Sequence, residues 1–485
     1  MTTGRELYPL TKSFAFRGFV FGLLAAVILG NLAIGFAMWC FVATAGLLWR
    51  SDHLPIMSFC IGYQWLFVVL GYTIYLWTGE FPGQRFLGDI QKAVFYSSLG
   101  LLFLAFGVRL TSRKVGVVGR VAPHGNYNID RLFWLVIVLF MLDWMVELNL
   151  LGLPSQILHP VRILLKLRYL FLFLMLIEVH RNRQGYRIAA LAFTIAIVPK
   201  LLTGMSSFKE PLFFLGILML GRYVAHARTV SERRTNRRII AIGALLATFL
   251  LAIGLVWNQD LKVKWRMALW SGEIAGSPID KLAAFGGMLS DSLERFDSDT
   301  ATESLGSRMS SGVAYFSHVL DRVPAMLDHE YGLFVGRGVS HVLTPRFLFP
   351  DKRDLGGDSW IVRKYAGLSV SGDEQGTSVG LGYLGEFYID FGFFGIVALS
   401  FLFGAYFGLL YKYIYYIAPS QQIGSAFSIV LMLDYFTGYE SNFAKLLGGM
   451  TQMVLIYSFV MFTVGRALHN YLSGSKERRE AATIG

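Results

Sequence analysis

The polar stretch between residues 258 and 385 is rich in fixed positive charge. Its densest run is PRFLFPDK at positions 345–352, where two prolines restrict the backbone on either side of Arg346. A guanidinium group holds two phosphate oxygens at once, and a lysine adds a point charge. The pattern is therefore typical of a phosphate site. Its candidate cations are Arg266, Arg308, Arg337, Arg346, Lys352, Arg353, Arg363 and Lys364.

Two acidic residues follow in the run GLGYLGEFYIDFG at positions 380–392. Glu386 and Asp390 are four residues apart, so they share one face of a helix. The sequence leaves two interpretations open for them. They belong to a functional site, or they are two solvated acids beside a tight, glycine-lined helix entry. Neither Arg346 nor Glu386 is expected to lie in a packed core.

The composition of the whole chain is typical of a membrane protein. Of its 485 residues, 54% are hydrophobic and 16% are charged, whereas soluble domains average about 25% charged residues. The apolar residues form runs long enough to cross a bilayer. Because both cysteines, Cys40 and Cys60, lie in or beside such runs, we expect no disulfide and no thiol metal site. About twelve spans are predicted: Phe14–Gly30, Leu32–Trp49, Ser58–Trp77, Lys92–Leu110, Leu132–Leu151, Ile163–Val179, Arg187–Thr203, Phe208–Ala225, Ile239–Trp257, Phe391–Tyr413, Ile423–Thr437 and Leu446–Ala467.

The net charge of +12 is explained better by membrane topology than by nucleic-acid binding, because most basic residues flank apolar runs. Lysines and arginines gather in one set of loops, which we assign to the cytoplasm together with both termini. We therefore expect about nine helices over 1–257, an external loop over 258–385, about three helices over 386–468 and a cytoplasmic tail over 469–485. The external loop is periplasmic if the cell is Gram-negative, and its helix-like segments, Lys281–Phe296 and Val313–Leu327, should lie against the outer membrane surface.

Most ionisable residues inside the predicted spans fall in the external half of the membrane. One interpretation is a charged, water-filled cavity that opens outward. The other is a set of internal ion pairs, such as Asp143 or Glu147 with Lys166 or Arg168. A further anion site is predicted where a span begins at Ser206-Ser207-Phe208-Lys209-Glu210-Pro211, because Lys209 and the positive end of the helix dipole coincide there.

The two motifs resemble the Wzy-type polymerases of O-antigen and capsule repeat units. Members of that family carry a Pro-Arg…Pro-x-Lys segment in a large external loop, matched here by Pro345, Arg346, Pro350 and Lys352. A Gly-x-x-Gly-Glu-x-Tyr-x-Asn-Phe-Gly segment then enters the next span. It is matched by Gly382, Gly385, Glu386, Tyr388, Phe391 and Gly392. The chain departs from the family at Asp390, where Asn is usual, and at Arg353, where Pro is common.

The resemblance implies a GT-C-like membrane fold and a metal-independent glycosyltransferase in the bacterial inner membrane. Its substrates would be oligosaccharides linked to undecaprenyl pyrophosphate, with membrane lipid and a chain-length regulator protein as further partners, and without a cofactor or nucleic acid. A cationic cradle would bind the leaving pyrophosphate, with Arg346, Lys352, Arg308 and Lys209 as first candidates. Glu386 would be the base for the acceptor hydroxyl, with His341 and Asp390 as alternatives. Binding roles are further expected for Arg266, Arg337, Arg353, Lys166 and Arg168.

Two rival functions remain open at this point. An O-antigen ligase would use the same donor with a lipid A-core acceptor. A transporter or flippase of the lipid-linked unit would bind its cargo near the midplane, between related repeats. The sequence has no evident repeat, and its charges lie outside the midplane, so we favour the polymerase.

Overall fold

The chain is helical throughout the part that the structure describes. The computed structural model describes residues 12–49, 55–83, 88–113, 127–147, 150–182, 184–202, 210–224, 254–274, 278–344, 357–372 and 378–473, with positions 241, 248, 252, 349 and 374. No β-strand occurs among these residues. The all-α fold class is therefore confirmed for them.

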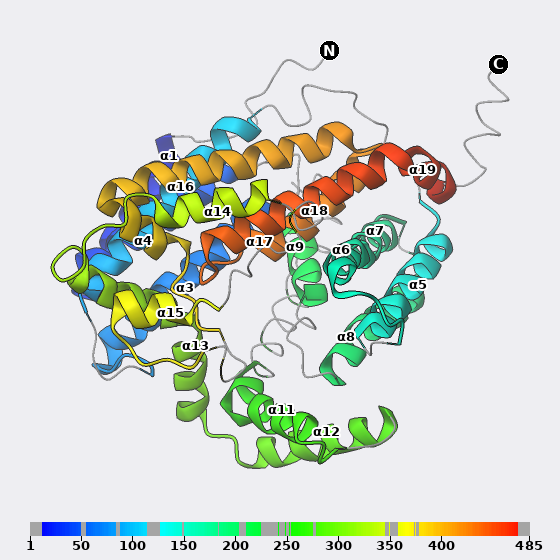
Figure 1. Cartoon of the computed structure of the whole chain (residues 1–485), viewed down its shortest axis with the longest axis horizontal. Coiled ribbons are helices and arrows are strands. Elements are labelled where there is room, and N and C mark those ends of the chain that lie inside the picture. The colour runs from blue at the N-terminus through cyan, green and yellow to red at the C-terminus, as the bar shows by residue number, and fades with distance from the viewer. Residues whose placement is uncertain are drawn as a thin grey trace. The chain divides into compact units, whose positions relative to one another are not determined.

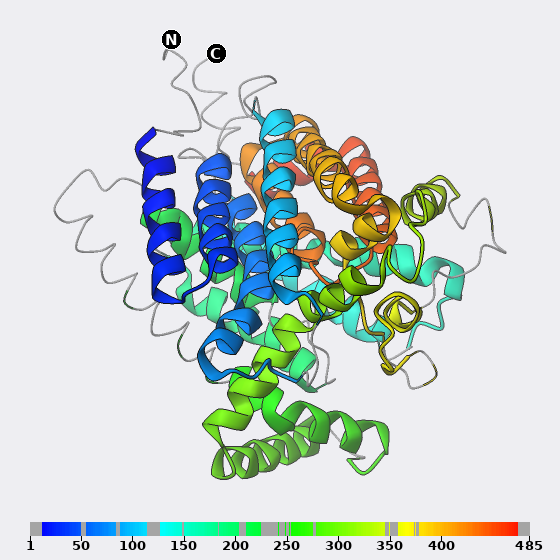
Figure 2. The ribbon, with the colours of Figure 1, turned by 90° about the vertical axis from the view of Figure 1, so that its left-hand side faces the viewer.

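The helices divide into two compact units, each described by itself. The first unit comprises Met1–Lys114, Asp299–Lys412 and Met432–Gln452; the second comprises Val115–Ser298, Tyr413–Leu431 and Met453–Gly485. The first unit contains α1 (Lys12–Ile28), α2 (Leu32–Leu48), α3 (Ile56–Thr78), α4 (Ile90–Ser112), nearly all of α13 (Ser298–Arg322), α14 (Leu333–Leu343), α15 (Ser359–Ile361), η3 (Val362–Ala366) and most of α16 (Tyr383–Ile417). Within this unit α1, α2 and α4 lie side by side (Figure 2).

The second unit holds the described helices of residues 115–298, together with α19 near the C-terminus. They are α5 (Ile129–Glu147), α6 (Ser155–Leu165), α7 (Leu167–Asn182), α8 (Tyr186–Leu202), α9 (Glu210–Val224), η2 (Trp257–Leu261), α11 (Lys262–Trp270), α12 (Pro278–Glu294) and α19 (Gly465–Ser473). Helix α5 packs on α7 and α8 (Figure 1). Two further helices, α17 (Gln421–Tyr435) and α18 (Phe443–Thr463), contribute residues to both units.

Four helices, α3, α4, α16 and α18, are long and apolar enough to cross a membrane. Their length and composition mark the chain as a helical membrane protein, while the count of twelve spans and a GT-C-like fold remain predictions. The first apolar run forms two helices, because Gly30 has a positive φ of 62° and Asn31 caps α2 by accepting hydrogen bonds from Ala33 N and Ile34 N. Helix α16 starts at Tyr383, eight residues before the predicted start of its span.

Glycines let α4 and α16 approach closely. A Cβ atom on Gly107 of α4 would lie 2.1 Å from Phe401 O, and one on Gly404 of α16 would lie 2.0 Å from Leu104 O. Small residues at such crossings are how membrane helices pack without a hydrophobic driving force between them. This packing fixes α16, which carries both acids of the second motif.

Helix α16 is interrupted at Phe391 and Gly392, which have non-helical backbone angles. The carbonyl groups just before the interruption lose their hydrogen-bond donors within the helix. The loop before α14 supplies donors in their place. Glu330 N donates to Ile389 O and Tyr331 N donates to Asp390 O, both at 3.0 Å. The interruption therefore docks this loop and α14 onto α16.

In the second unit, the acids and bases of the predicted spans form a buried ion-pair network. Asp143 accepts from Arg168 at 2.9 Å and from Lys200 at 2.7 Å, and Lys200 also binds Glu147. Asp143, Arg168 and Lys200 are buried. The internal ion pair between Asp143 and Arg168, one of the two sequence interpretations, is thus present.

Candidate functional site

Helix α14 presents two of the predicted site residues, Arg337 and His341, which are one turn apart and share a face. It packs against the start of α18 so closely that a Cβ atom on Gly338 would lie 2.7 Å from Phe443 Cδ1. One turn further along, the ring of His341 lies beside Gly448. The absence of a side chain at Gly338 therefore brings the polar face of α14 to the start of α18.

Asp390 holds the N-terminus of α14 in place. Its Oδ1 accepts a hydrogen bond from Phe334 N at 3.1 Å, and its Oδ2 accepts one from Val335 N at 2.9 Å. These are the backbone donors that a helix start leaves without partners. The side chain is 0% exposed, so the expectation of a solvated acid is wrong: the carboxylate is buried as a helix cap.

Glu386 holds the N-terminus of α18 in a similar way. Its Oε2 accepts a hydrogen bond from Phe443 N at 2.7 Å, while Asn442 Oδ1 accepts one from Lys445 N at 2.6 Å. Glu386 is 2% exposed, which contradicts the expectation that it lies outside a packed core. The free N–H group at the start of α18 thus gives this buried side chain a hydrogen-bond partner.

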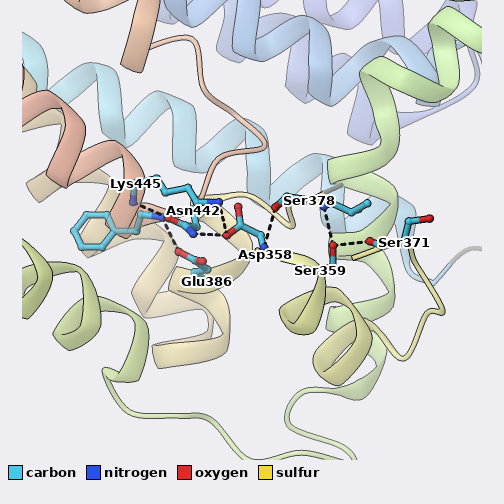
Figure 3. Close-up of polar contacts among 9 residues, drawn as sticks. Asp358, Ser359, Ser371, Ser378, Glu386, Asn442 and Lys445 are labelled. Atoms are coloured by element: carbon cyan, nitrogen blue, oxygen red, sulfur yellow. Dashed lines mark hydrogen bonds and ion pairs between the residues drawn. The ribbon is translucent and has the colours of Figure 1, made fainter. Parts of the chain in front are cut away.

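Asp358 links this cap to the short helix α15 (Figure 3). Its carboxylate accepts from Asn442 Nδ2 and, at 3.0 Å, from Lys445 Nζ. Its backbone N–H donates to Ser378 Oγ at 2.9 Å. Asp358 is buried, whereas the Lys445 side chain is 39% exposed, so the network reaches the surface through its cation.

A second cation, Arg308 of α13, flanks the turn between α17 and α18. Its Nη1 binds Glu440 Oε2 at 2.6 Å, and Ser311 Oγ donates to Glu440 Oε1 at 2.7 Å. The turn fits closely because Gly382 has a φ of 94° and a Cβ atom there would lie 2.4 Å from Tyr439 O. The glycine-rich motif thus packs against the turn between α17 and α18, from which Glu440 binds Arg308.

Acids and bases differ in exposure across this part of the first unit. Asp358, Glu386 and Asp390 are buried and accept hydrogen bonds from backbone or side-chain donors. The cations Arg308 and Lys445 are more than a third exposed. Each of these cations is paired with an acid, Arg308 with Glu440 and Lys445 with Asp358, and the cation is the more exposed member of each pair.

A further charged group lies on the loop that docks onto α16. Glu330 Oε1 accepts from Lys364 Nζ at 2.9 Å and from the Tyr365 hydroxyl. These hydrogen bonds lower the pKa of the Glu330 carboxyl and raise the pKa of Lys364. Burial raises the pKa of the Tyr365 hydroxyl to about 12, so it remains a hydrogen-bond donor at neutral pH.

The structure brings together some of the predicted residues. Glu386, Asp390, Arg337, His341 and Arg308 all belong to the first unit. Three others belong to the second unit: Arg168 lies in the ion-pair network, Lys166 caps the end of α6, and Arg266 is half-buried on α11. Four candidates lie outside the described residues: Lys209, Arg346, Lys352 and Arg353.

Sequence reasoning missed the network partners Asp358, Asn442 and Lys445. Asn442 is a recognisable N-cap residue before an apolar run, and this pattern could have placed the start of α18 at Phe443. Asp358 has no such signal, because the two partners of its carboxylate are more than 80 positions away in the chain.

Comparison of the chain with protein-family models, with curated proteins and with solved structures gives no match.

Proposed function

We propose that this chain is a membrane glycosyltransferase that joins lipid-linked oligosaccharide repeat units into a polysaccharide, in the manner of Wzy-type polymerases. The observation that supports it most is the exposure pattern of the site. Buried carboxylates hold α14 and α18, while Arg308 and Lys445 are partly exposed. The exposed cationic ends of these two ion pairs can contact an anionic group outside the protein core.

In this reaction the acceptor hydroxyl attacks the anomeric carbon of the donor sugar. The bond between that carbon and the pyrophosphate oxygen breaks, and undecaprenyl pyrophosphate leaves with the negative charge. Arg337, Lys445 and Arg308 would stabilise this charge as it develops. Arg346 and Lys352, which follow α14 in the chain, remain the sequence-based candidates for the same role.

The proton of the acceptor hydroxyl requires a base. Glu386 and Asp390, two of the three candidates, are buried helix caps. His341 is partly exposed on the same face of α14 as Arg337. We therefore assign the base to His341, which would accept the proton while Glu386 and Asp390 position the two helices.

A transporter draws support from one feature, because interrupted helices often form transporter binding sites. In α16, however, the groups at the interruption bind protein. Glu330 N and Tyr331 N occupy the carbonyl groups of Ile389 and Asp390, and α14 occupies the Asp390 carboxylate. This use of the interruption as a docking point favours the enzyme.

The proposal is tested in a strain that lacks the gene. Loss of a polymerase leaves single repeat units on the cell surface. Loss of a ligase accumulates long polymer on undecaprenyl pyrophosphate, and loss of a flippase traps single units on the cytoplasmic face. Either of the last two results would overturn the proposal.

Variants of Arg337 then test the site. Arg337→Ala and Arg337→Lys should both fail to restore long chains, because an ammonium group cannot reproduce a two-point contact with phosphate. Arg113→Ala is the matched control, since Arg113 is exposed at the end of α4 in the same unit. Normal chain length with Arg337→Ala, at normal protein level, would remove Arg337 from the site.

A further inference from the structure

Trp360 of α15 is partly exposed although three aromatic or cationic groups approach its ring. It stacks on Phe334 with ring centroids 6.1 Å apart and an interplanar angle of 14°. The Arg337 guanidinium carbon lies 5.5 Å from the ring centroid. Phe334 and Arg337 are one turn apart on α14, so both approach from that helix. The indole is nevertheless 36% exposed.

Buried rings and hydrogen bonds next to Trp360 hold its indole in place. Phe334 and Tyr365, which meet edge to face at 5.7 Å, are both buried. Ser359 Oγ donates to Ser371 O at 2.6 Å and accepts from Val379 N at 2.9 Å (Figure 3). A ring with this support loses little conformational freedom when a ligand covers it.

Polar groups are arranged around the indole. Arg337 lies against it, and Lys364 and Glu330 form their ion pair beside Tyr365, whose ring centroid is 6.4 Å from that of Trp360. The indole is thus a flat apolar ring with a cation over it and an ion pair beside its aromatic neighbour. A pyranose ring has the complementary form, with C–H groups on its face and hydroxyl groups around its rim. The negative face of an indole attracts such weakly positive C–H groups.

We propose that the exposed face of Trp360 is a stacking subsite for a sugar ring. This subsite rests on the proposed function, in which Arg337 binds the donor pyrophosphate. Since Arg337 contacts Trp360, the ring that stacks there is the sugar bonded to that pyrophosphate. Trp360 would thus orient the donor sugar while Arg337 holds its leaving group.

The competing explanation is that Trp360 is an ordinary interfacial tryptophan, a residue common where membrane proteins meet the lipid headgroups. Trp77 provides the matched control. It is 85% exposed near the end of α3. An interfacial role would make the two tryptophans respond alike.

Binding is measured apart from activity with purified protein labelled with 5-fluorotryptophan. The ten tryptophans give separate fluorine resonances, and those of Trp360 and Trp77 are assigned from the Trp360→Phe and Trp77→Phe proteins. The probe is the repeat-unit oligosaccharide released from its lipid and freed of phosphate. It should shift the Trp360 resonance in a saturable way and leave the Trp77 resonance in place. An unmoved Trp360 resonance, or equal shifts at both positions, would overturn the subsite.

Activity provides the second measurement, using purified lipid-linked repeat units in nanodiscs. Trp360→Ala should raise KM about ten-fold, the scale of one aromatic stacking contact. The KM of Trp360→Phe should stay within about three-fold of the wild-type value, because phenylalanine keeps an aromatic face. The KM of Trp77→Ala should equal the wild-type value. A wild-type protein that elongates nothing would count against the proposed function. Normal KM in Trp360→Ala beside an active wild type would count against the subsite alone.

Discussion

At the residue scale, the two acids of the glycine-rich motif act as structural anchors. Asp390 and Glu386 are one turn apart on α16, yet each accepts hydrogen bonds from the start of a different helix, α14 and α18. A carboxylate can accept at both oxygens, as Asp390 does, whereas an amide has only one acceptor. Asp390 can therefore accept from both backbone donors at the start of α14, which an asparagine could not do.

Replacing Asp390 should therefore loosen α14. We expect Asp390→Asn to lower the free energy of unfolding by about 1–2 kcal/mol, because one backbone donor of a buried helix start loses its acceptor. Thermal unfolding of the purified protein measures the change. Asp328→Asn, on an exposed residue of the preceding loop, is the control and should be neutral. An Asp390→Asn protein as stable as the control would show that the cap is dispensable.

The ion pair of Glu330 and Lys364 should give a weak pH dependence. Because the pKa of Glu330 lies below its ordinary value of 4.5, its stabilisation is present above that pH and is lost as the pH falls through the lowered pKa. Because the pKa of Lys364 lies above 10.5, its contribution is lost only as the pH rises through the raised value.

Glu330→Gln should accordingly remove part of the loss of stability between pH 7 and pH 3.5. The difference from wild type should be below about 1 kcal/mol, since both side chains are partly exposed. Unfolding temperatures at the two pH values measure it, with the exposed Glu80→Gln as the control. Identical pH profiles for wild type and Glu330→Gln would contradict this assignment.

The sequence could identify these residues but not what they contact. Spacing placed Glu386 and Asp390 on one helix face, and that placement holds. Their burial depends on the starts of α14 and α18, which lie more than 50 positions away. No local pattern encodes such a contact, and Asp358 went unnoticed for the same reason.

At the element scale, the start of α16 packs closely against the turn between α17 and α18. Gly382 has a positive φ, and its backbone meets the Tyr439 carbonyl so closely that a methyl group has no room. Hydropathy placed the start of this span at Phe391, because the glycine-rich run reads as a loop. The helix starts at Tyr383 because tertiary packing overrides that local tendency.

Gly382→Ala should thus be destabilising by more than about 1 kcal/mol, through both the steric clash and the unfavourable φ. Gly286→Ala is the matched control. Gly286 lies inside α12, and nothing lies within 4 Å of a Cβ atom there, so alanine should be neutral or stabilising by up to about 1 kcal/mol. Denaturation of the two purified variants compares them. Equal stability would mean that the turn between α17 and α18 does not constrain Gly382.

Most other helices could be predicted to within a few residues. The apolar runs Ser58–Trp77 and Lys92–Leu110 became α3 (Ile56–Thr78) and α4 (Ile90–Ser112), and the amphipathic run Lys281–Phe296 became α12 (Pro278–Glu294). A periodic or uniformly apolar segment predicts a helix from its own residues alone. The interruption of α16 does not, because it depends on the loop that replaces its hydrogen bonds.

At the scale of the whole molecule, the outer-leaflet reaction requires that the first unit's loop before α14 faces the outside of the membrane. The two cysteines, Cys40 and Cys60, are free and buried, so added cysteines can be labelled against a low background. In intact cells with a permeable outer membrane, Met326→Cys should react with an impermeant maleimide. Asn470→Cys, in the predicted cytoplasmic tail, should react only after lysis. The opposite pattern would place the site in the cytoplasm and remove the outer-leaflet mechanism.

The proposed function requires that this chain elongates a lipid-linked glycan without a second protein. Its most direct test is the purified protein reconstituted in liposomes with purified undecaprenyl-pyrophosphate-linked repeat units, followed by mass spectrometry of the lipid-linked products. We predict a ladder of products that differ by one repeat unit, with one undecaprenyl pyrophosphate released per addition. The Arg337→Ala protein should give no ladder. Repeat units that remain single with the wild-type protein, at confirmed reconstitution and orientation, would contradict the proposed function.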